Sequence, residues 1–268
     1  MGKVFVIIGK SFSGKDTLLN NILVDEEFCK ENNLERLVRV TTRKPRPNEI
    51  EGKDYYFISD EDYEDLYKLR ADVVVSSYDS EFGQLHYITD FSKLDPDKNY
   101  IVISDTESIP NYKGILKDKL CIIYLVPPNW EIFRRFSGRD DNSEYSDLKY
   151  KEIYRRFIDD TIKFGKHSNE FTSNCNCITI IGKDICLELL KDHMNQFMND
   201  ECKNCGILIN DRTSVLYCNS YIPKGNIPYS QIFKDNEIVL GNTITIYTEQ
   251  ELYKFTNKDF YRVLEFGK

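Results

Sequence analysis

The chain has 268 residues, of which 41% are hydrophobic and 30% charged, a composition typical of a soluble globular protein with one large domain or two unequal ones. Its 36 lysines and arginines against 44 aspartates and glutamates give a net charge of -8, so the basic field that long nucleic acids require is missing. No stretch approaches the roughly 20 apolar residues of a membrane-spanning helix, and the first ten residues are typical of a strand, not of a secretory signal. We therefore expect a cytoplasmic protein with neither a nucleic-acid nor a membrane partner.

Short β-rich apolar runs alternate with amphipathic helical stretches up to about residue 198. This alternation is typical of an α/β domain with a mainly parallel sheet. The expected strands are Val4 to Ile8, Leu37 to Val40, Ile101 to Ser104, Cys121 to Val126 and Ile178 to Ile181, and the expected helices are Lys15 to Val24, Trp130 to Phe136, Lys149 to Phe164 and Lys183 to Met198.

The character of the chain changes after Met198, where short apolar runs are separated by Gly, Pro and Asn. We place a domain boundary near residue 199 and expect residues 199–268 to form a small β-rich extension. Within it, Cys202, Cys205 and Cys218 are candidate ligands of a structural zinc ion. No second C-x-x-C motif supplies an evident fourth ligand, so reduced, partly buried thiols are the leading interpretation and a redox pair is a third.

A phosphate-binding loop is indicated directly after the first expected strand. Its glycines permit a tight turn whose backbone N–H groups converge on an anion, and the following helix adds its dipole. The residue after the lysine is usually Ser or Thr, which binds Mg²⁺, but here it is Asp16; a carboxylate is also a hard ligand, and Thr17 is the alternative. We predict an ATP site with Mg²⁺, rather than a turn that binds no nucleotide, at Gly9, Ser11, Ser13, Gly14, Lys15, Asp16 and Thr17.

A second anion site is indicated by the stretch TTRKPRPNEIEGKDYYF, from Thr41 to Phe57. Arg43 and Arg46, stiffened by neighbouring prolines, can converge as forked donors on a phosphate, and the Tyr55 hydroxyl can complete the contact; a solvated basic turn is the alternative. This stretch closely resembles the monophosphate segment of the guanylate kinase family. The resemblance covers about residues 3 to 198, and further matches are Phe82-Gly83, the strand ending at Asp105, the sequence YLVPP, Ser137-Gly138-Arg139 and the helix with Arg155-Arg156.

The resemblance implies a three-part kinase, with an ATP-binding core, a monophosphate-binding insertion at about residues 41–99 and a lid at about residues 137–156. Lys15 would contact the β- and γ-phosphates of ATP, and Arg43 would bind the acceptor phosphate together with Arg46 and Tyr55. Arg139 and Arg156 would be lid arginines that neutralise the transferring phosphoryl group. The predicted catalytic residues are Lys15, Arg43, Arg139 and Arg156, since phosphoryl transfer needs mainly positioning and charge stabilisation. The remaining arginines of the lid helices are interpreted as ordinary surface charges, namely Arg134, Arg135 and Arg155.

The base pocket departs from the family pattern, in which a glutamate, an aspartate and two small hydroxyl residues read guanine. Only the aspartate is kept, as Asp105, for which a magnesium or ribose contact and a helix N-cap are alternatives. The glutamate position falls at Val73, or at Asp72 with one insertion. Arg39 and Gln84 stand where the family has its two hydroxyl residues, and Phe82 stands where the family has a tyrosine that touches the acceptor phosphate. The monophosphate site is predicted at Arg39, Arg43, Arg46, Tyr55, Phe82, Gln84 and Asp105.

The leading functional interpretation is an ATP-dependent kinase that converts GMP, dGMP or a related or modified nucleoside monophosphate to the diphosphate. A kinase for a different acceptor, with the tail supplying part of the specificity, is one alternative. The other is a non-catalytic guanylate-kinase-like module that binds phosphorylated protein segments. Such modules commonly lose the phosphate loop, so the intact loop favours the enzyme.

Overall fold

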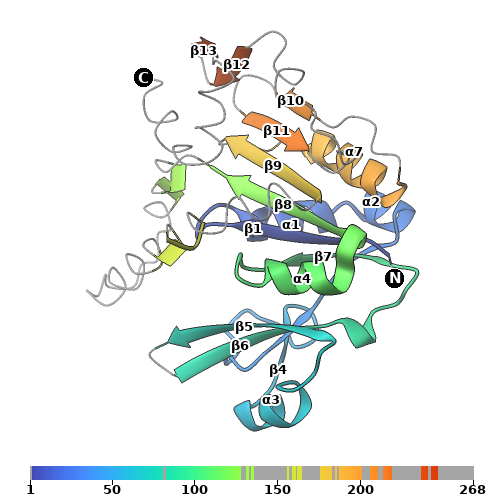
Figure 1. The fold of residues 1–268 in the computed structure, drawn as a ribbon, viewed down its shortest axis with the longest axis vertical. Coiled ribbons are helices and arrows are strands. Elements are labelled where there is room, and N and C mark those ends of the chain that lie inside the picture. Colours follow the sequence, from blue (N-terminus) through green and yellow to red (C-terminus); the bar gives the residue numbers. More distant parts are fainter. Residues whose placement is uncertain are drawn as a thin grey trace.

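A computed structural model describes residues 2–80, 83–127, 131–132, 134–135, 156, 159–160, 162–164, 176–182, 185 and 187–200, together with the backbone of residues 206–210, 214–218, 237–240 and 243–246. These residues form an α/β fold with a large sheet in the core and a smaller sheet beside it (Figure 1). Among the described residues no helix has the length and apolar character needed to cross a membrane.

The large sheet has the strand order β10-β11-β9-β8-β1-β7-β2. The run from β9 to β2 is parallel, which confirms the predicted fold class, and β10 and β11 pair in antiparallel fashion at the β9 edge. The strands are β1 (Val4–Gly9), β2 (Leu34–Arg36), β7 (Asn99–Ile103), β8 (Leu120–Val126), β9 (Asn176–Gly182), β10 (Gly206–Asn210) and β11 (Ser214–Cys218).

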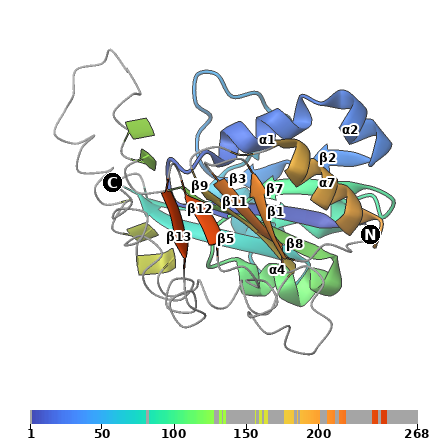
Figure 2. The ribbon, with the colours of Figure 1, turned by 90° about the horizontal axis from the view of Figure 1, so that it is seen from above.

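Helices cover both faces of this sheet (Figure 2). On one face lie α1 (Lys15–Leu23), α2 (Glu26–Glu31) and α7 (Leu187–Met198), and on the other lies α4 (Ile109–Leu116). Successive side chains of β1 point to opposite faces, so Val4 and Val6 pack with α4 whereas Phe5 and Ile7 pack with α1 and α7. Burial on both faces is why the strand is apolar at every position.

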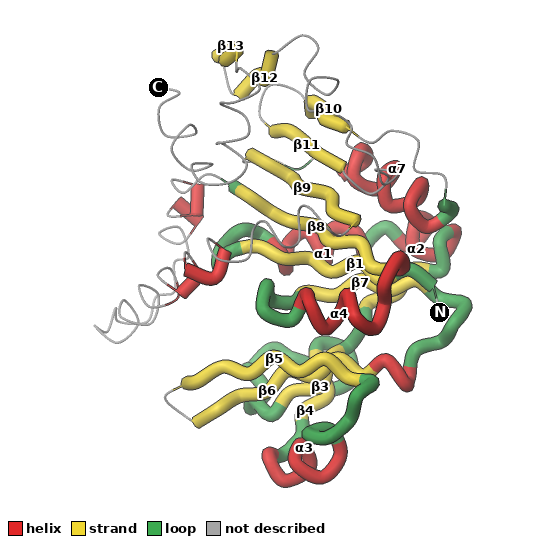
Figure 3. The backbone as a smooth tube through the Cα atoms, in the orientation of Figure 1, coloured by secondary structure: helices red, strands yellow, loops and turns green. Residues whose placement is uncertain are grey.

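The smaller sheet, of order β4-β3-β6-β5, is formed by the part of the sequence between β2 and β7 and lies beside the large sheet (Figure 3). It contains β3 (Arg39–Thr41), β4 (Tyr55–Phe57), β5 (Val73–Ser80) and β6 (Gly83–Asp90), with α3 (Asp60–Leu66) packed against it. The expected single strand from Leu37 to Val40 is wrong. Leu37 is buried in the core of the large sheet and Val40 in that of the small one, so one apolar run serves two cores and the strand is broken between them.

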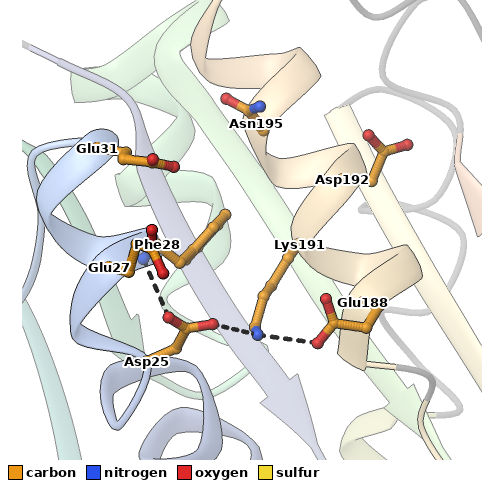
Figure 4. Close-up of a pocket in the computed structure, with 8 residues that line it drawn as sticks. All are labelled: Asp25, Glu27, Phe28, Glu31, Glu188, Lys191, Asp192 and Asn195. Atoms are coloured by element: carbon orange, nitrogen blue, oxygen red, sulfur yellow. Dashed lines mark hydrogen bonds and ion pairs between the residues drawn. The ribbon is translucent and has the colours of Figure 1, made fainter.

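Helix α7 is joined to α2 by a buried lysine (Figure 4). The Nζ atom of Lys191 donates to Asp25 Oδ2 at 2.5 Å and to Glu188 Oε1 at 3.1 Å, and it lies over the Phe28 ring. These residues line an acidic pocket of about 320 Å³. Because a buried ammonium group needs a charged partner, loss of Asp25 would leave the Lys191 charge poorly compensated where α7 packs on α2.

The described strands of the C-terminal region belong to two different sheets. The β10–β11 hairpin extends the core sheet, whereas β12 (Glu237–Leu240) and β13 (Thr243–Ile246) form a two-stranded sheet of their own. The β-rich character expected of this region is therefore present in its described parts. The domain boundary near residue 199 stays a prediction, and the pairing of β11 with β9 makes the hairpin part of the core sheet.

Candidate active site

The loop between β1 and α1 has the tight geometry that its glycines were expected to provide. Gly14 caps α1 with a φ of 98°, in the left-handed region that favours glycine. At Gly9, a Cβ atom would lie 2.5 Å from the Oγ of Ser13, so no larger residue fits there without movement. The loop can therefore fold closely around an anion only with glycine at these two positions.

Polar groups of this loop are arranged for an anionic ligand. Lys15 Nζ donates to the carbonyl oxygens of Gly9 at 2.7 Å and Lys10 at 2.9 Å. Burial lowers the pKa of Lys15, while the charges of Asp160 and Asp16 act in the opposite direction. The buried Ser13 Oγ has no hydrogen-bond partner within the described part of the chain, and such an orphaned hydroxyl is suited to a ligand oxygen. The loop thus fits the phosphates of ATP.

The predicted magnesium ligands lie at the first turn of α1. Asp16 and Thr17 are both exposed, so their oxygens are accessible to an ion bound with the nucleotide. Carboxylate and hydroxyl oxygens are hard ligands of the kind Mg²⁺ prefers. The donor set therefore fits the ion, and the choice between the two residues stays a prediction.

Arg135, which the sequence analysis took for a surface charge, contacts the phosphate loop. Its Nη1 donates to the Ser13 carbonyl oxygen at 2.6 Å, and its Nε donates to Glu131 Oε1 at 2.8 Å. Glu131 has a side-chain exposure of only 1% and also binds Arg134, whose side chain is 62% exposed. The i, i+4 spacing of Glu131 and Arg135 was a usable signal for this pair, but its contact with the loop is long-range.

A second loop contact that the sequence analysis missed comes from Asp160. Its Oδ2 accepts a hydrogen bond from the Ser11 amide at 2.6 Å, and its charge acts on both Lys10 and Lys15. No local pattern singles out this carboxylate, because its partner lies 149 residues away in the sequence.

Arg43 lies in an aromatic and acidic setting on the acceptor side. Its Nη2 donates to Glu49 Oε1 at 2.7 Å and its Nε to the Tyr87 hydroxyl at 3.1 Å, and its guanidinium lies 5.4 Å from the centre of the Tyr55 ring. The other oxygen of Glu49 accepts from the backbone N–H of Arg46 at 2.8 Å. Glu49, which sequence reasoning did not single out, therefore ties together the two arginine positions, while the Arg46 side chain is exposed.

Charges from several parts of the chain act on the Tyr55 hydroxyl. Burial is the main reason that the pKa of its hydroxyl is raised; the Asp16 carboxylate raises it as well, and Arg39 and Arg43 lower it. Coulombic effects of this kind fall off with distance. The Asp16 carboxylate is therefore near enough to act on Tyr55, and Arg43 lies beside the Tyr55 ring.

Arg39, one of the residues predicted to line the base pocket, is buried. Arg39 is 7% exposed; its Nη1 donates to the Ile103 carbonyl oxygen at 3.2 Å, and its Nη2 donates to the Tyr87 carbonyl oxygen at 2.9 Å and to Ser76 Oγ at 3.1 Å. Its Nε is buried without a hydrogen-bond partner in the described residues. Arg39 thereby links β3 to β5, β6 and β7.

Asp105, the predicted base-reading carboxylate, is already surrounded by donors of its own chain. The Ser108 amide and hydroxyl each donate to it at 2.9 Å, and the Ser108 hydroxyl also lies 2.5 Å from that of Ser76. Burial alone would raise the pKa of Asp105, but the hydrogen bonds and the nearby Arg39 charge outweigh it and lower the pKa. Asp105 is therefore charged, and Ser108 already uses part of its acceptor capacity.

The other predicted residues are placed as follows. Gln84 is exposed and makes a long contact of 3.4 Å to Asp79, and Val73 packs in the small core. Arg156 is exposed in a helical segment. Phe82, Arg139, Cys202 and Cys205 lie outside the described residues, and Cys218 is described by its backbone alone. Cys29, Cys121 and Cys177 are reduced thiols, and the described residues contain no cluster of three or more metal-ligating side chains.

Comparison with known proteins identifies the family. The family model for guanylate kinase matches residues 1–145. The chain belongs to the guanylate kinase family. The match is shorter than the span of about 3 to 198 expected from the sequence, so it leaves the C-terminal region unassigned.

Individual relatives are distant. The chain is 33% identical to the guanylate kinase of Clostridium tetani over 159 residues, which is 58% of this chain and 72% of that protein. It is 28% identical to the guanylate kinase of Anaplasma phagocytophilum over 156 residues, which is 56% of this chain and 71% of that protein. A crystal structure of the Anaplasma enzyme aligns with a TM-score of 0.47 and 20% identity over 76% of this chain and 87% of that chain.

Proposed function

We propose that this protein is an ATP-dependent nucleoside monophosphate kinase with weakened or redirected guanine recognition. The observation that carries the proposal is the loop between β1 and α1, where Gly9 and Gly14 allow a close turn, Lys15 is held against the loop and the buried Ser13 Oγ has no hydrogen-bond partner among the described residues. These are the groups that a nucleotide phosphate would engage. Family membership supports the same reaction class.

The proposed transfer is a displacement at the γ-phosphorus of ATP. An oxygen of the acceptor phosphate forms the new bond to phosphorus, the bond to the β,γ-bridging oxygen breaks, and ADP leaves. Lys15, once released from the loop carbonyls, binds the β- and γ-phosphates; Arg43, Arg46 and Tyr55 bind the acceptor phosphate. Arg139 and Arg156 add positive charge in the transition state, which is worth most where charge develops and water is excluded. Mg²⁺ held by Asp16 or Thr17 would neutralise phosphate charge.

The contacts around Asp105 support the altered base recognition. A guanine ring offers N–H donors to a carboxylate, but the Ser108 amide and hydroxyl already donate to Asp105. Arg39, whose charge acts on Asp105, has a buried Nε with no hydrogen-bond partner among the described residues, and this group is a donor. A base edge that presents donors is therefore poorly matched here, and an unmatched buried polar contact costs about 1–3 kcal/mol, roughly 5- to 150-fold in preference.

The test is an ADP-release assay against ribo- and deoxyribonucleoside monophosphates of all common bases. We expect clear activity, with modest preference for GMP or dGMP or with a better acceptor elsewhere in the panel. Arg39→Ser, which restores a small hydroxyl, is expected to raise the relative kcat/KM for guanine acceptors. Asp105→Asn is the companion variant, since it removes the charge while keeping the shape.

Two outcomes would count against the proposal. Absence of ADP release with every acceptor would favour the non-catalytic module that binds phosphorylated segments. A guanine preference as sharp as that of a dedicated guanylate kinase, unaffected by Asp105→Asn, would show that the base site has been misplaced.

A further inference from the structure

A carboxylate of the chain lies where the phosphate loop would bind an anion. Asp160 Oδ2 accepts the Ser11 amide hydrogen at 2.6 Å, the short distance of a charge-assisted hydrogen bond. Backbone N–H groups of such a loop are the groups that bind nucleotide phosphates. Asp160 therefore makes with Ser11 the kind of contact that a phosphate oxygen would make.

The lysines of the loop respond to the same carboxylate. Burial lowers the pKa of Lys10 to about 8, and the charge of Asp160 acts against that shift. At Lys15 the charge of Asp160 likewise opposes the effect of burial. Asp160 is thus close to both cations of the loop, and Lys15 meanwhile donates to the loop's own carbonyl oxygens.

The residues that follow Asp160 fix it in this position. Phe164 is 7% exposed and stacks on Tyr124 of β8 at a ring separation of 5.6 Å. Lys163 Nζ donates to Glu107 Oε2 at 2.8 Å and lies over the Tyr78 ring on the acceptor side. One short helical segment therefore contacts the phosphate loop, the large sheet and the smaller sheet.

We propose that Asp160 is a positioning residue that occupies the phosphate site until the ATP polyphosphate displaces it, and that it thereby sets the affinity for ATP. Two anions cannot share the Ser11 amide, so each binding event must break the Asp160 contact. The apparent dissociation constant for ATP is then the intrinsic constant divided by the fraction of protein in which Asp160 has left the loop. This proposal rests on the proposed binding of ATP at the loop.

The experiment measures binding of a non-hydrolysable ATP analogue, and separately of inorganic tripolyphosphate, to the full-length protein by calorimetry. Asp160→Ala removes the competing carboxylate and should tighten both ligands about 10-fold or more, because a charge-assisted contact no longer has to be broken. Asp160→Glu keeps a carboxylate and should give a smaller change. Asp192→Asn is the control for net charge: it also removes one negative charge, from an exposed site on α7 whose side chain bonds to Gln196.

A structural role for Asp160 gives the opposite sign. Loss of a merely structural contact would loosen the loop and weaken ATP binding, whereas the proposal predicts tighter binding, a lower KM for ATP and a larger rise in melting temperature on adding the analogue. The difference between wild type and Asp160→Ala should persist at high salt, since a direct contact is screened less than a distant charge. Equal or weaker binding by Asp160→Ala, with wild type binding normally, overturns this proposal alone. Failure of both proteins to bind either ligand overturns the proposed function with it.

Discussion

The phosphate loop takes its shape from consecutive residues between Gly9 and Thr17, whereas the surroundings of Arg39 are assembled from β3, β5, β6 and the end of β7. In the loop, the left-handed φ of Gly14 and the close approach at Gly9 are properties of the local backbone. On the acceptor side, Arg39 contacts residues 37 to 64 positions away. The first kind of site can be recognised in a sequence, and the second depends on which strands meet.

This contrast also separates two kinds of chemistry. Phosphate binding uses backbone N–H groups and a few cations, so it tolerates exchange of the surrounding side chains. Base reading depends on individually paired donors and acceptors, and one new residue such as Arg39 changes it. We therefore expect changes in the loop to affect all acceptors equally and changes around Asp105 to affect them unequally.

The largest expected effect is that of Lys15→Ala. This variant removes the cation aimed at the transferring phosphoryl group, and kcat should fall by about 10²-fold or more with every acceptor. Steady-state kinetics with two acceptors of different base measure it. Lys113→Ala, which changes an exposed lysine on α4, is the control. Near-normal turnover of Lys15→Ala would remove the loop from the mechanism.

Arg43→Ala tests the acceptor phosphate site. It removes a charged donor that Glu49 and Tyr87 hold in place, and the KM for every monophosphate should rise by roughly 10- to 100-fold. The KM for ATP should change little, because ATP binds on the other side of the site. Glu49→Gln should have a weaker effect of the same kind. An equal rise in the KM for ATP and in the KM for the acceptor would contradict the separation of the two sites.

The sequence predicts the part of the fold that rests on local periodicity. Strands β1 and β8 and helix α1 follow from apolar runs and a glycine-rich turn, and their predicted bounds agree with the structure to within one residue. The break between Leu37 and Arg39 was missed because both flanking runs are apolar, and only the tertiary structure shows that they enter different cores. The contacts of Arg135 and Asp160 with the loop were missed for the same reason: each joins distant segments by one side chain.

The stability of the smaller sheet at the end of β6 should be sensitive to acid. Asp90, at the end of β6, has a side-chain exposure of 5% and accepts two hydrogen bonds from Arg70, at 2.9 and 3.0 Å. Burial alone would raise its pKa, but the bonds from Ser92 and Arg70 outweigh it, so the folded pKa is lowered. A lowered pKa means that the stabilisation is fully present above the unfolded value of about 3.9 and is lost as the pH falls through the folded value.

We therefore expect Asp90→Asn to lower the free energy of unfolding by about 1–3 kcal/mol at pH 7. Urea unfolding of wild type and variant at pH 7 and near pH 3 measures this difference, which should shrink at the lower pH. Asp72→Asn is the matched control, because Asp72 binds the same arginine from an exposed position and exposed ion pairs contribute little. A difference that stays constant with pH would show that the Asp90 charge is not the cause.

The smallest expected effect is that of Asp16→Ser, which places the commoner magnesium ligand after the loop lysine. If Asp16 binds the ion, loss of its charge should raise the Mg²⁺ concentration for half-maximal activity by a few-fold, about what one hard ligand contributes when a hydroxyl replaces a carboxylate. Activity at saturating Mg²⁺ should be kept, because Lys15 and the backbone N–H groups of the loop are unchanged. Thr17→Val is the companion variant. A magnesium profile that shifts with Thr17→Val and not with Asp16→Ser would assign the ion to the threonine. The Asp16 carboxylate would then act only through its charge near Tyr55, and Asp16→Ser would change the KM for the acceptor instead.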